Sequence, residues 1–358
     1  MQIITTKMID MRTNNTPPKP SENSIPTKRI GWIDRAKAIA MICVVYGHIN
    51  LYDYYGWGLN IENCKIYSLT AIFQLPLFMF LSGLVASTKR RTIIDSLRLA
   101  CSKFRQLLMP LITIGGLYAL WAFGRYPWEI FRSGAFLGYW YLWCLFVFYV
   151  IHYCYEQCAT RIEKFEFKIV FDFVWLICFS IMLNIGMKHM SNPDILSYSF
   201  IANLFPYFFL GVMVKKYQLQ DKIFSNDFPL ALGILFSCTF IIAHSQNIRY
   251  PLAYQSFCIG MILVVIGIFY RLESHYNSVL NYLNFVGRNT LDVFIFHYFL
   301  ISSFQNLWIG EWLIAGHYSP FTELLFAGIP ALIFCTISIY IGKLIRQSTL
   351  LSMIIFNK

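Results

Sequence analysis

Ten apolar stretches, each 17 to 22 residues long, constrain this chain more than any other feature of its sequence. A helix of about 20 residues crosses the hydrocarbon core of a bilayer. Helices also bond all their backbone groups internally, as a bilayer requires. We therefore predict an all-α fold, a polytopic transmembrane helical bundle with about ten spanning helices. The spans are expected near residues 33–52, 66–87, 107–124, 136–155, 169–187, 198–214, 229–245, 251–270, 290–309 and 322–342.

Composition and charge agree with a membrane protein. Hydrophobic residues make up 57% of the chain and charged residues only 13%, against about 25% in soluble domains. The formal charge of +11 lies in short stretches between the apolar runs, so we expect a lipid bilayer and no nucleic acid as partner. If the N-terminus is cytoplasmic, 24 of the 29 Lys and Arg residues fall on the cytoplasmic side. This asymmetry predicts that the N and C termini are both cytoplasmic, and it favours ten spans over nine or eleven.

The charged and proline-rich segments set the expected domain boundaries. Residues 1–29 are polar and contain four prolines, which predicts a disordered cytoplasmic tail. Residues 30–345 form one membrane domain, and residues 346–358 form a short cytoplasmic tail. In the segment 88–105 basic residues alternate with Ile and Leu, which predicts an amphipathic helix on the cytoplasmic surface of the membrane.

The first span, with the sequence GWIDRAKAIAMICVVYGH over residues 31–48, carries ionisable side chains. His48 is the eleventh residue after Lys37, so it lies about 20° from Lys37 around the helix and about 16 Å further along it. This spacing puts Lys37 near the inner interface and His48 near mid-membrane. An ionisable residue at that depth usually marks a site. The alternative is a neutral His bonded to a backbone carbonyl of a neighbouring helix.

These residues resemble the opening motif of the acyltransferase 3 family of membrane acyltransferases. That motif has an Asp, a basic residue, ten further residues and an essential His. The basic residue is usually Arg, and Lys37 keeps its charge without the planar fork of Arg. Three later stretches also resemble family motifs, and the match runs in order from residue 30. They are FQLPLFMFLSGL (73–84), GYWYLWCLF (138–146) and FVGRNTLDVFIFH (285–297).

The resemblance implies a sugar O-acetyltransferase in the bacterial inner membrane. Its donor would be cytoplasmic acyl-CoA, commonly acetyl-CoA, and its acceptor a hydroxyl of a cell-envelope carbohydrate or of a lipid-linked precursor. The resemblance implies no permanently bound cofactor. His48 would be the general base. The CoA phosphates need positive charge at the cytoplasmic helix ends, for which the candidates are Lys37, Lys89, Arg90, Arg91 and Arg288.

Four further residues are candidates for lining the site: Asp34, Gln74, Asn289 and His297. Asp34 either acts in the site or forms a salt bridge with Lys37 or Arg35. Asn289 and Asp292 have the spacing of a helix N-terminus, which puts His297 about 12 Å into its helix, at the depth of His48. His297 then either shares a cavity with His48 or is a satisfied core residue.

Inside the second span, Pro76 frees the carbonyl of Ile72. Gln74 could bond that carbonyl or a substrate. Ser82 and Gly83 favour close helix packing over catalysis.

We predict no metal site, because no third ligand with suitable spacing accompanies His48 and His297. The remaining five histidines, including His152, lie at expected helix ends or loops, and we expect them to be solvated. A transporter of a small anionic or sugar solute is the alternative function, because ten helices with buried His would fit it. Turnover of labelled acetyl-CoA would distinguish the two functions.

Overall fold

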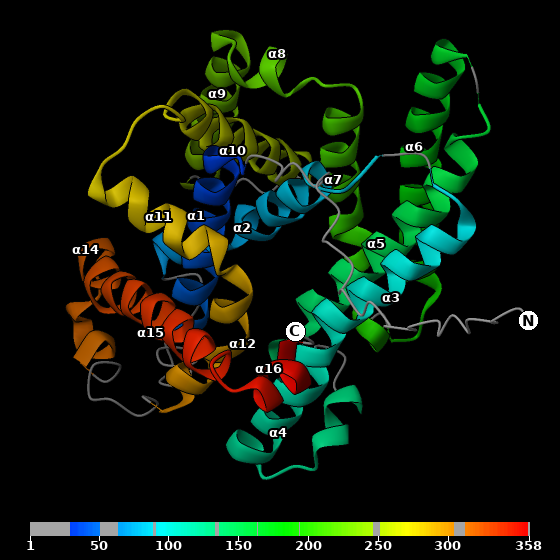
Figure 1. Cartoon of the computed structure of the whole chain (residues 1–358). Coiled ribbons are helices and arrows are strands. Elements are labelled where there is room, and N and C mark those ends of the chain that lie inside the picture. The colour runs from blue at the N-terminus through cyan, green and yellow to red at the C-terminus, as the bar shows by residue number, and fades with distance from the viewer. Residues whose placement is uncertain are drawn as a thin grey trace, which may run out of the picture. The chain divides into compact units, whose positions relative to one another are not determined.

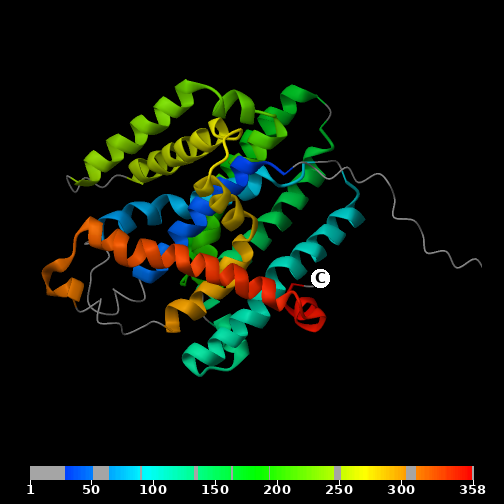
Figure 2. The ribbon, with the colours of Figure 1, turned by 60° about the vertical axis from the view of Figure 1, so that its left-hand side comes forward.

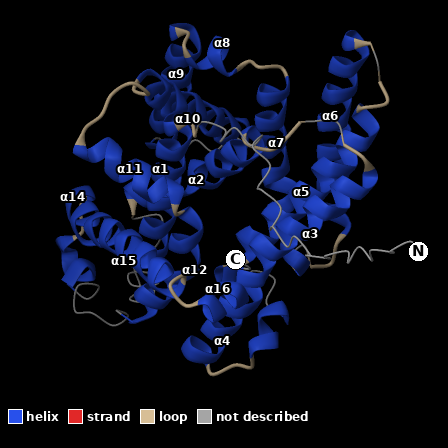
Figure 3. Cartoon of the chain, in the orientation of Figure 1, coloured by secondary structure: helices blue, strands red, loops and turns tan. Residues whose placement is uncertain are grey.

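The structure is a computed structural model that describes residues 29–50, 64–88, 91–132, 136–162, 164–192, 194–245, 251–303 and 312–356. Within these ranges every regular element is a helix (Figure 3). Residues from Gly31 onward form one compact unit. The α-helices are α1 (Gly31–Ile49), α2 (Lys65–Leu84), α3 (Ile93–Pro110), α4 (Gly116–Phe123), α5 (Trp140–Ala159), α6 (Phe165–His189), α7 (Tyr198–Lys216), α8 (Gln220–Phe224), α9 (Asp227–Ser245), α10 (Pro251–Arg271), α11 (Ser278–Arg288), α12 (Thr290–Ser303), α14 (Pro320–Glu323), α15 (Ile329–Ile345) and α16 (Thr349–Phe356). Shorter 3-10 and π turns are η4 (Leu111–Gly115), η5 (Pro127–Arg132), η6 (Phe136–Gly138), η7 (Ile195–Ser197), η8 (Leu313–His317) and η9 (Leu324–Gly328).

The helices confirm the all-α membrane fold. Seven helices in the described part of the chain are long and apolar enough to cross a bilayer: Lys65–Leu84, Ile93–Phe123, Phe165–His189, Ile195–Lys216, Asp227–His244, Leu252–Arg271 and Pro320–Ile345. The other three predicted spans also coincide with helices, namely α1, α5 and the shorter apolar α12. The count of ten spans and the cytoplasmic location of both termini stay predictions.

Helix α1 occupies a central position and packs against α2, α10, α11, α12 and α15 (Figures 1 and 2). Its first turn is fixed to the end of α10. The Glu273 carboxylate accepts hydrogen bonds from the backbone N–H groups of Gly31 at 3.0 Å and Trp32 at 2.6 Å. Arg35, only 1% exposed, donates to the carbonyls of Leu272 and His275 at 2.5 and 3.1 Å. The first basic residue of α1 therefore caps a neighbouring helix.

Helices α2 and α7 pack through glycines. A Cβ atom on Gly83 would overlap the Phe208 carbonyl oxygen, and one on Gly211 would overlap the Phe80 carbonyl oxygen. Only residues without a side chain allow two backbones to approach this closely. Gly83 is thus a packing residue, as we expected.

Helix α3 differs from the predicted surface helix at 88–105. It begins at Ile93, with the Thr92 hydroxyl accepting from the Asp95 N–H at 3.1 Å, and continues through η4 into α4 without a break. The amphipathic segment is therefore the first part of a 31-residue helix and not a separate element. Pro110 does not end the helix, because the chain passes this residue as a π turn.

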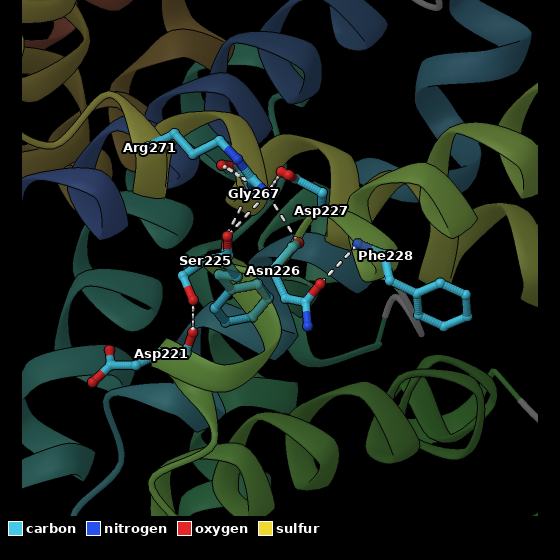
Figure 4. A network of polar contacts seen from close by, with 8 residues as sticks. Asp221, Ser225, Asn226, Asp227, Phe228, Gly267 and Arg271 are labelled. Atoms are coloured by element: carbon cyan, nitrogen blue, oxygen red, sulfur yellow. Dashed lines mark hydrogen bonds and ion pairs between the residues drawn. The ribbon is translucent and has the colours of Figure 1, made fainter.

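A polar network fixes the turn between α8 and α9 to the end of α10 (Figure 4). Arg271 donates to the carbonyls of Phe224, Ser225 and Asn226 and to the Asp227 carboxylate at 2.8–3.3 Å. These carbonyls lie near the end of α8, where a helix lacks internal partners. Arg271 supplies the missing donors.

Helix α6 is joined to its neighbours by a buried charge. Asp172 is fully buried and accepts hydrogen bonds from Lys216 at 2.7 and 3.0 Å, from Tyr155 at 2.6 Å and from Tyr217 at 2.7 Å. These partners come from α5 and from the end of α7. Most other α6 side chains are exposed, as expected for a helix that faces lipid.

The C-terminal segment contacts the bundle. Arg346 binds the Asp292 carboxylate through two bonds of 2.5 and 2.7 Å, and its guanidinium lies 3.9 Å from the centre of the Phe356 ring. The region predicted as a tail therefore contains the helix α16 and packs near α12.

Candidate active site

His48 and His297 meet in the structure although 249 residues separate them in sequence. Nδ1 of His48 lies 2.8 Å from Nε2 of His297. The two rings are nearly parallel, 7° apart, with centroids separated by 5.0 Å. His297 is fully buried and His48 partly buried. Helices α1 and α12 thus bring the two intramembrane histidines into one site.

The hydrogen bonds around this pair define which nitrogen carries a proton. Nδ1 of His297 lies 2.9 Å from the Val293 carbonyl, which can only accept, so this nitrogen donates. Nε2 of His297 is then an acceptor, and Nδ1 of His48 must donate to it. Nε2 of His48 consequently carries the lone pair. The partner of a His commonly sets its tautomer in this way.

Tyr298 completes the site. Its hydroxyl lies 3.3 Å from Nε2 of His48 and 3.1 Å from the Gly138 carbonyl, and both atoms can accept its single proton. A Cβ atom at residue 138 would overlap the Tyr298 hydroxyl, and Gly138 also has a positive φ of 96°. Only glycine suits both conditions. We did not single out Tyr298 from the sequence, although it directly follows His297.

A cavity of about 270 Å³ lies between α1, α2, α3, α5 and α12. Two lysines line it, Lys37 of α1 and Lys103 of α3. The ammonium nitrogen of Lys103 lies 4.5 Å from the centre of the Tyr149 ring and 3.0 Å from the Gln106 side-chain oxygen. Lys103 was not among the predicted site residues, since its position within an amphipathic helix favoured a role at the membrane surface.

The cavity and the histidine pair lie on the same two helices, α1 and α12. Met41 lines it on α1, and Thr290 lines it on α12. His48 lies seven residues beyond Met41, and His297 lies seven residues beyond Thr290. Seven helical residues correspond to a rotation of only about 20° and a rise of about 10 Å. On each helix, the residue that lines the cavity and the histidine of the pair therefore lie on the same face, about 10 Å apart along the axis.

A sequence profile described as an acyltransferase domain, that of the acyltransferase 3 family, matches residues 30–340 of the 358. The chain belongs to this family. This confirms the resemblance seen in the four motifs, and the protein is an acyltransferase that transfers groups other than amino-acyl groups. Neither a curated protein nor a solved structure matches the chain.

The other predicted charged residues of this acyltransferase take different places. Asp34 is buried and pairs with Arg288, whose Nε lies 3.4 Å from its carboxylate. This partner comes from α11 and not from α1, where Lys37 and Arg35 were the expected partners. Among the described residues, the cavity lining includes Lys37 but neither Arg91 nor Arg288. The predicted phosphate-binding residues Lys89 and Arg90 lie outside the described residues.

Of the polar candidates, Gln74 lies close to Gly47, the residue before His48, and Asn289 lies at the junction of α11 and α12. Gln74 is 7% exposed, and its side-chain oxygen has no hydrogen-bond partner among the described residues. The Ile72 carbonyl, which Pro76 was expected to free, accepts instead from the Cys258 thiol at 3.3 Å. The Asn289 side-chain amide donates to the Phe285 carbonyl in the last turn of α11 at 2.7 Å. Helix α12 begins at Thr290, which confirms the predicted helix start at Asn289.

Asp292 lies in the first turn of α12, as expected, and binds Arg346. One correction concerns His152, which we expected to be solvated. It is 1% exposed and lies 3.0 Å from the Ser87 carbonyl. Its position near the end of a helix suggested solvent, but the segment following α2 covers it.

The C-terminal end of α1 is fixed by a buried carboxylate. Glu323 is fully buried and accepts from the hydroxyls of Tyr46 and Tyr318 and from the N–H groups of Ile66 and Tyr67, at 3.2 and 2.8 Å. Burial, reinforced by the nearby Glu323, raises the pKa of the Cys64 thiol to about 11. These bonds fix α1 at Tyr46, two residues before His48.

Within the described residues, no cluster of three or more His, Cys, Asp or Glu side chains could hold a metal ion.

Proposed function

We propose that this acyltransferase moves an acyl group, most simply acetyl, from cytoplasmic acyl-CoA to a hydroxyl of an envelope carbohydrate or its lipid-linked precursor. The observation that carries the proposal is the contact between His48 and His297, on the same two helices that line a cavity containing two lysines. A nitrogen base placed beyond a cationic cavity suits an anionic donor that carries a reactive group at the end of a long arm.

The cavity supports a division of the donor into two parts. Its volume of about 270 Å³ lies just below the range typical of small-molecule sites, about 300–1,000 Å³, so it suits the slender pantetheine arm better than the nucleotide. Lys37 and Lys103 would attract the phosphates at its basic end. The remaining candidates, Lys89, Arg90, Arg91 and Arg288, would act further out along the same cytoplasmic side.

The reaction then follows from the hydrogen bonds of the pair. The acceptor hydroxyl gives its proton to Nε2 of His48 as its oxygen attacks the thioester carbonyl carbon. His297 accepts from Nδ1 of His48 throughout and so stabilises the imidazolium. When the carbon–sulfur bond breaks, the CoA sulfur takes the electron pair and then the proton from His48. The products are an O-acyl ester and the free CoA thiol.

Purified full-length protein in liposomes tests this proposal. We expect the wild-type protein to turn over radiolabelled acetyl-CoA and to acylate an envelope glycan fraction, and His48→Ala to abolish both reactions. His189→Ala is a matched control, because His189 is exposed on α6 outside the site. Wild-type rates from His48→Ala would exclude His48 as the base. Solute uptake without acetyl-CoA turnover would instead favour a transporter, and mass spectrometry of envelope glycans with and without the gene would identify the acceptor.

A further inference from the structure

The hydroxyl of Tyr141 is a buried polar group without a partner. The residue is 5% exposed, and its hydroxyl makes no hydrogen bond of normal distance and angle within the described residues. The polar side chain nearest in role is Ser82, which lines the same cavity, but the Ser82 hydroxyl donates its proton to the Phe78 carbonyl at 2.8 Å. Buried tyrosine hydroxyls usually find a partner, and an unpaired one disfavours folding. Other tyrosines near the site follow this rule, since Tyr139 donates to the Ile295 carbonyl at 2.8 Å. An unpaired hydroxyl at this position therefore calls for a functional explanation.

Tyr141 lines the cavity at the end that is nearer the histidine pair. Its ring centroid lies 5.3 Å from that of Phe294, which in turn lies 6.0 Å from that of His297. Tyr149, about 12 Å further along α5, contacts Lys103 at the basic end. Helix α5 therefore lines the cavity with the Tyr149 ring at the lysine end and with the Tyr141 hydroxyl at the end nearer the two histidines.

The start of α5 is also tied to the reacting nitrogen. The carbonyl of Gly138, three residues before Tyr141, lies 3.1 Å from the Tyr298 hydroxyl, and that hydroxyl lies 3.3 Å from Nε2 of His48. A single tyrosine therefore links the base to the segment that carries Tyr141.

We propose that the Tyr141 hydroxyl donates a hydrogen bond to the carbonyl oxygen of the donor thioester, an inference that rests on the proposed function. When the acceptor oxygen bonds to the carbonyl carbon, the carbonyl electron pair moves onto this oxygen. The Tyr141 O–H keeps its proton and stabilises the oxyanion. When the carbonyl re-forms, the carbon–sulfur bond breaks and His48 gives its proton to the sulfur. A hydrogen-bond donor that interacts with charge present only in the transition state raises kcat without tightening the binding of acyl-CoA.

Tyr141→Phe tests the inference because it removes only the hydroxyl. The probe is hydrolysis of radiolabelled acetyl-CoA by full-length protein in liposomes, with water as acceptor. We expect kcat to fall by about 10²–10³, as for the loss of one oxyanion donor, while KM for acetyl-CoA stays unchanged. The melting temperature should stay equal or rise, since the lost group was unpaired. Tyr153→Phe, a buried tyrosine of α5 outside the cavity lining, should keep the wild-type kcat.

Three results would overturn the inference: a wild-type kcat in Tyr141→Phe, a rise in KM with kcat unchanged, or a fall in melting temperature that accompanies the loss of activity. The last result would indicate a structural hydroxyl. A wild-type protein that does not turn over acetyl-CoA would overturn the proposed function, and this inference with it. An active wild-type protein together with an active Tyr141→Phe would overturn this inference alone.

Discussion

Replacing His297 by Ala removes the acceptor that fixes the tautomer of His48. The Nδ1–H of His48 then loses its partner at 2.8 Å, and an unpaired buried donor costs about 1–3 kcal/mol of folding free energy. Without this partner, His48 can carry its proton on Nε2, where it cannot accept one from a hydroxyl. The loss in kcat should approach the whole contribution of a general base, about 10²–10⁴. Expressed as a barrier, this is about 3–5 kcal/mol.

The assay is acetyl-CoA turnover in liposomes together with thermal unfolding. His297→Gln is the informative second variant, because its side-chain oxygen can occupy the place of Nε2 and accept from His48. We expect kcat of His297→Gln to be at least about tenfold higher than kcat of His297→Ala, which corresponds to a difference of about 1.4 kcal/mol in the barrier. The control is His152→Ala, since His152 is equally buried, bonds a backbone carbonyl and lies outside the site. It should lose stability but keep kcat.

The reasoning would be refuted if His297→Ala kept nearly wild-type kcat. It would also be refuted if Gln were as inactive as Ala while both variants stayed folded. In the first case His48 would need no partner, and in the second His297 would act by some means other than accepting from Nδ1.

Four further predictions follow from the packing and charges. Lys37→Ala should raise KM for acetyl-CoA about 10–100-fold, the effect of losing one charged hydrogen bond, with little change in kcat. Asp172→Asn leaves Lys216 without its counter-charge and should lower the free energy of unfolding by about 3 kcal/mol, the lower end of the usual range for a buried pair, because Lys216 is 16% exposed. The control is Asp227→Asn, whose ion pair is exposed, and its thermal unfolding should change little. Gly83→Val should prevent stable folding by separating α2 from α7, as loss of monodisperse protein in size-exclusion chromatography would show. The raised pKa of Cys64, about 11, keeps its thiol protonated at pH 8, so maleimide labelling followed by mass spectrometry should be slow there and accelerate only as the pH approaches 11.

The sequence alone determined the class of fold and the face of α1 that matters. Apolar runs long enough to span a bilayer predicted the helices, because the bilayer requires internally bonded backbone whatever the neighbours are. The regular turn of a helix put Lys37 and His48 on one face, and the four motifs led to the family. These inferences succeeded because each depends on residues close together in the chain.

The tertiary structure decided the partners. The structure joins His48 to His297, Asp34 to Arg288 and Arg35 to the end of α10, although each pair is more than 230 residues apart. It also reversed the expectation for His152 and revealed Tyr298, Lys103 and Tyr141 as site residues. Helical periodicity tells which side chains share a face but not which helix covers that face. That choice depends on close packing across the bundle, as at Gly83 and Gly211, and the unpaired hydroxyl of Tyr141 could be recognised only once every helix around it was in place.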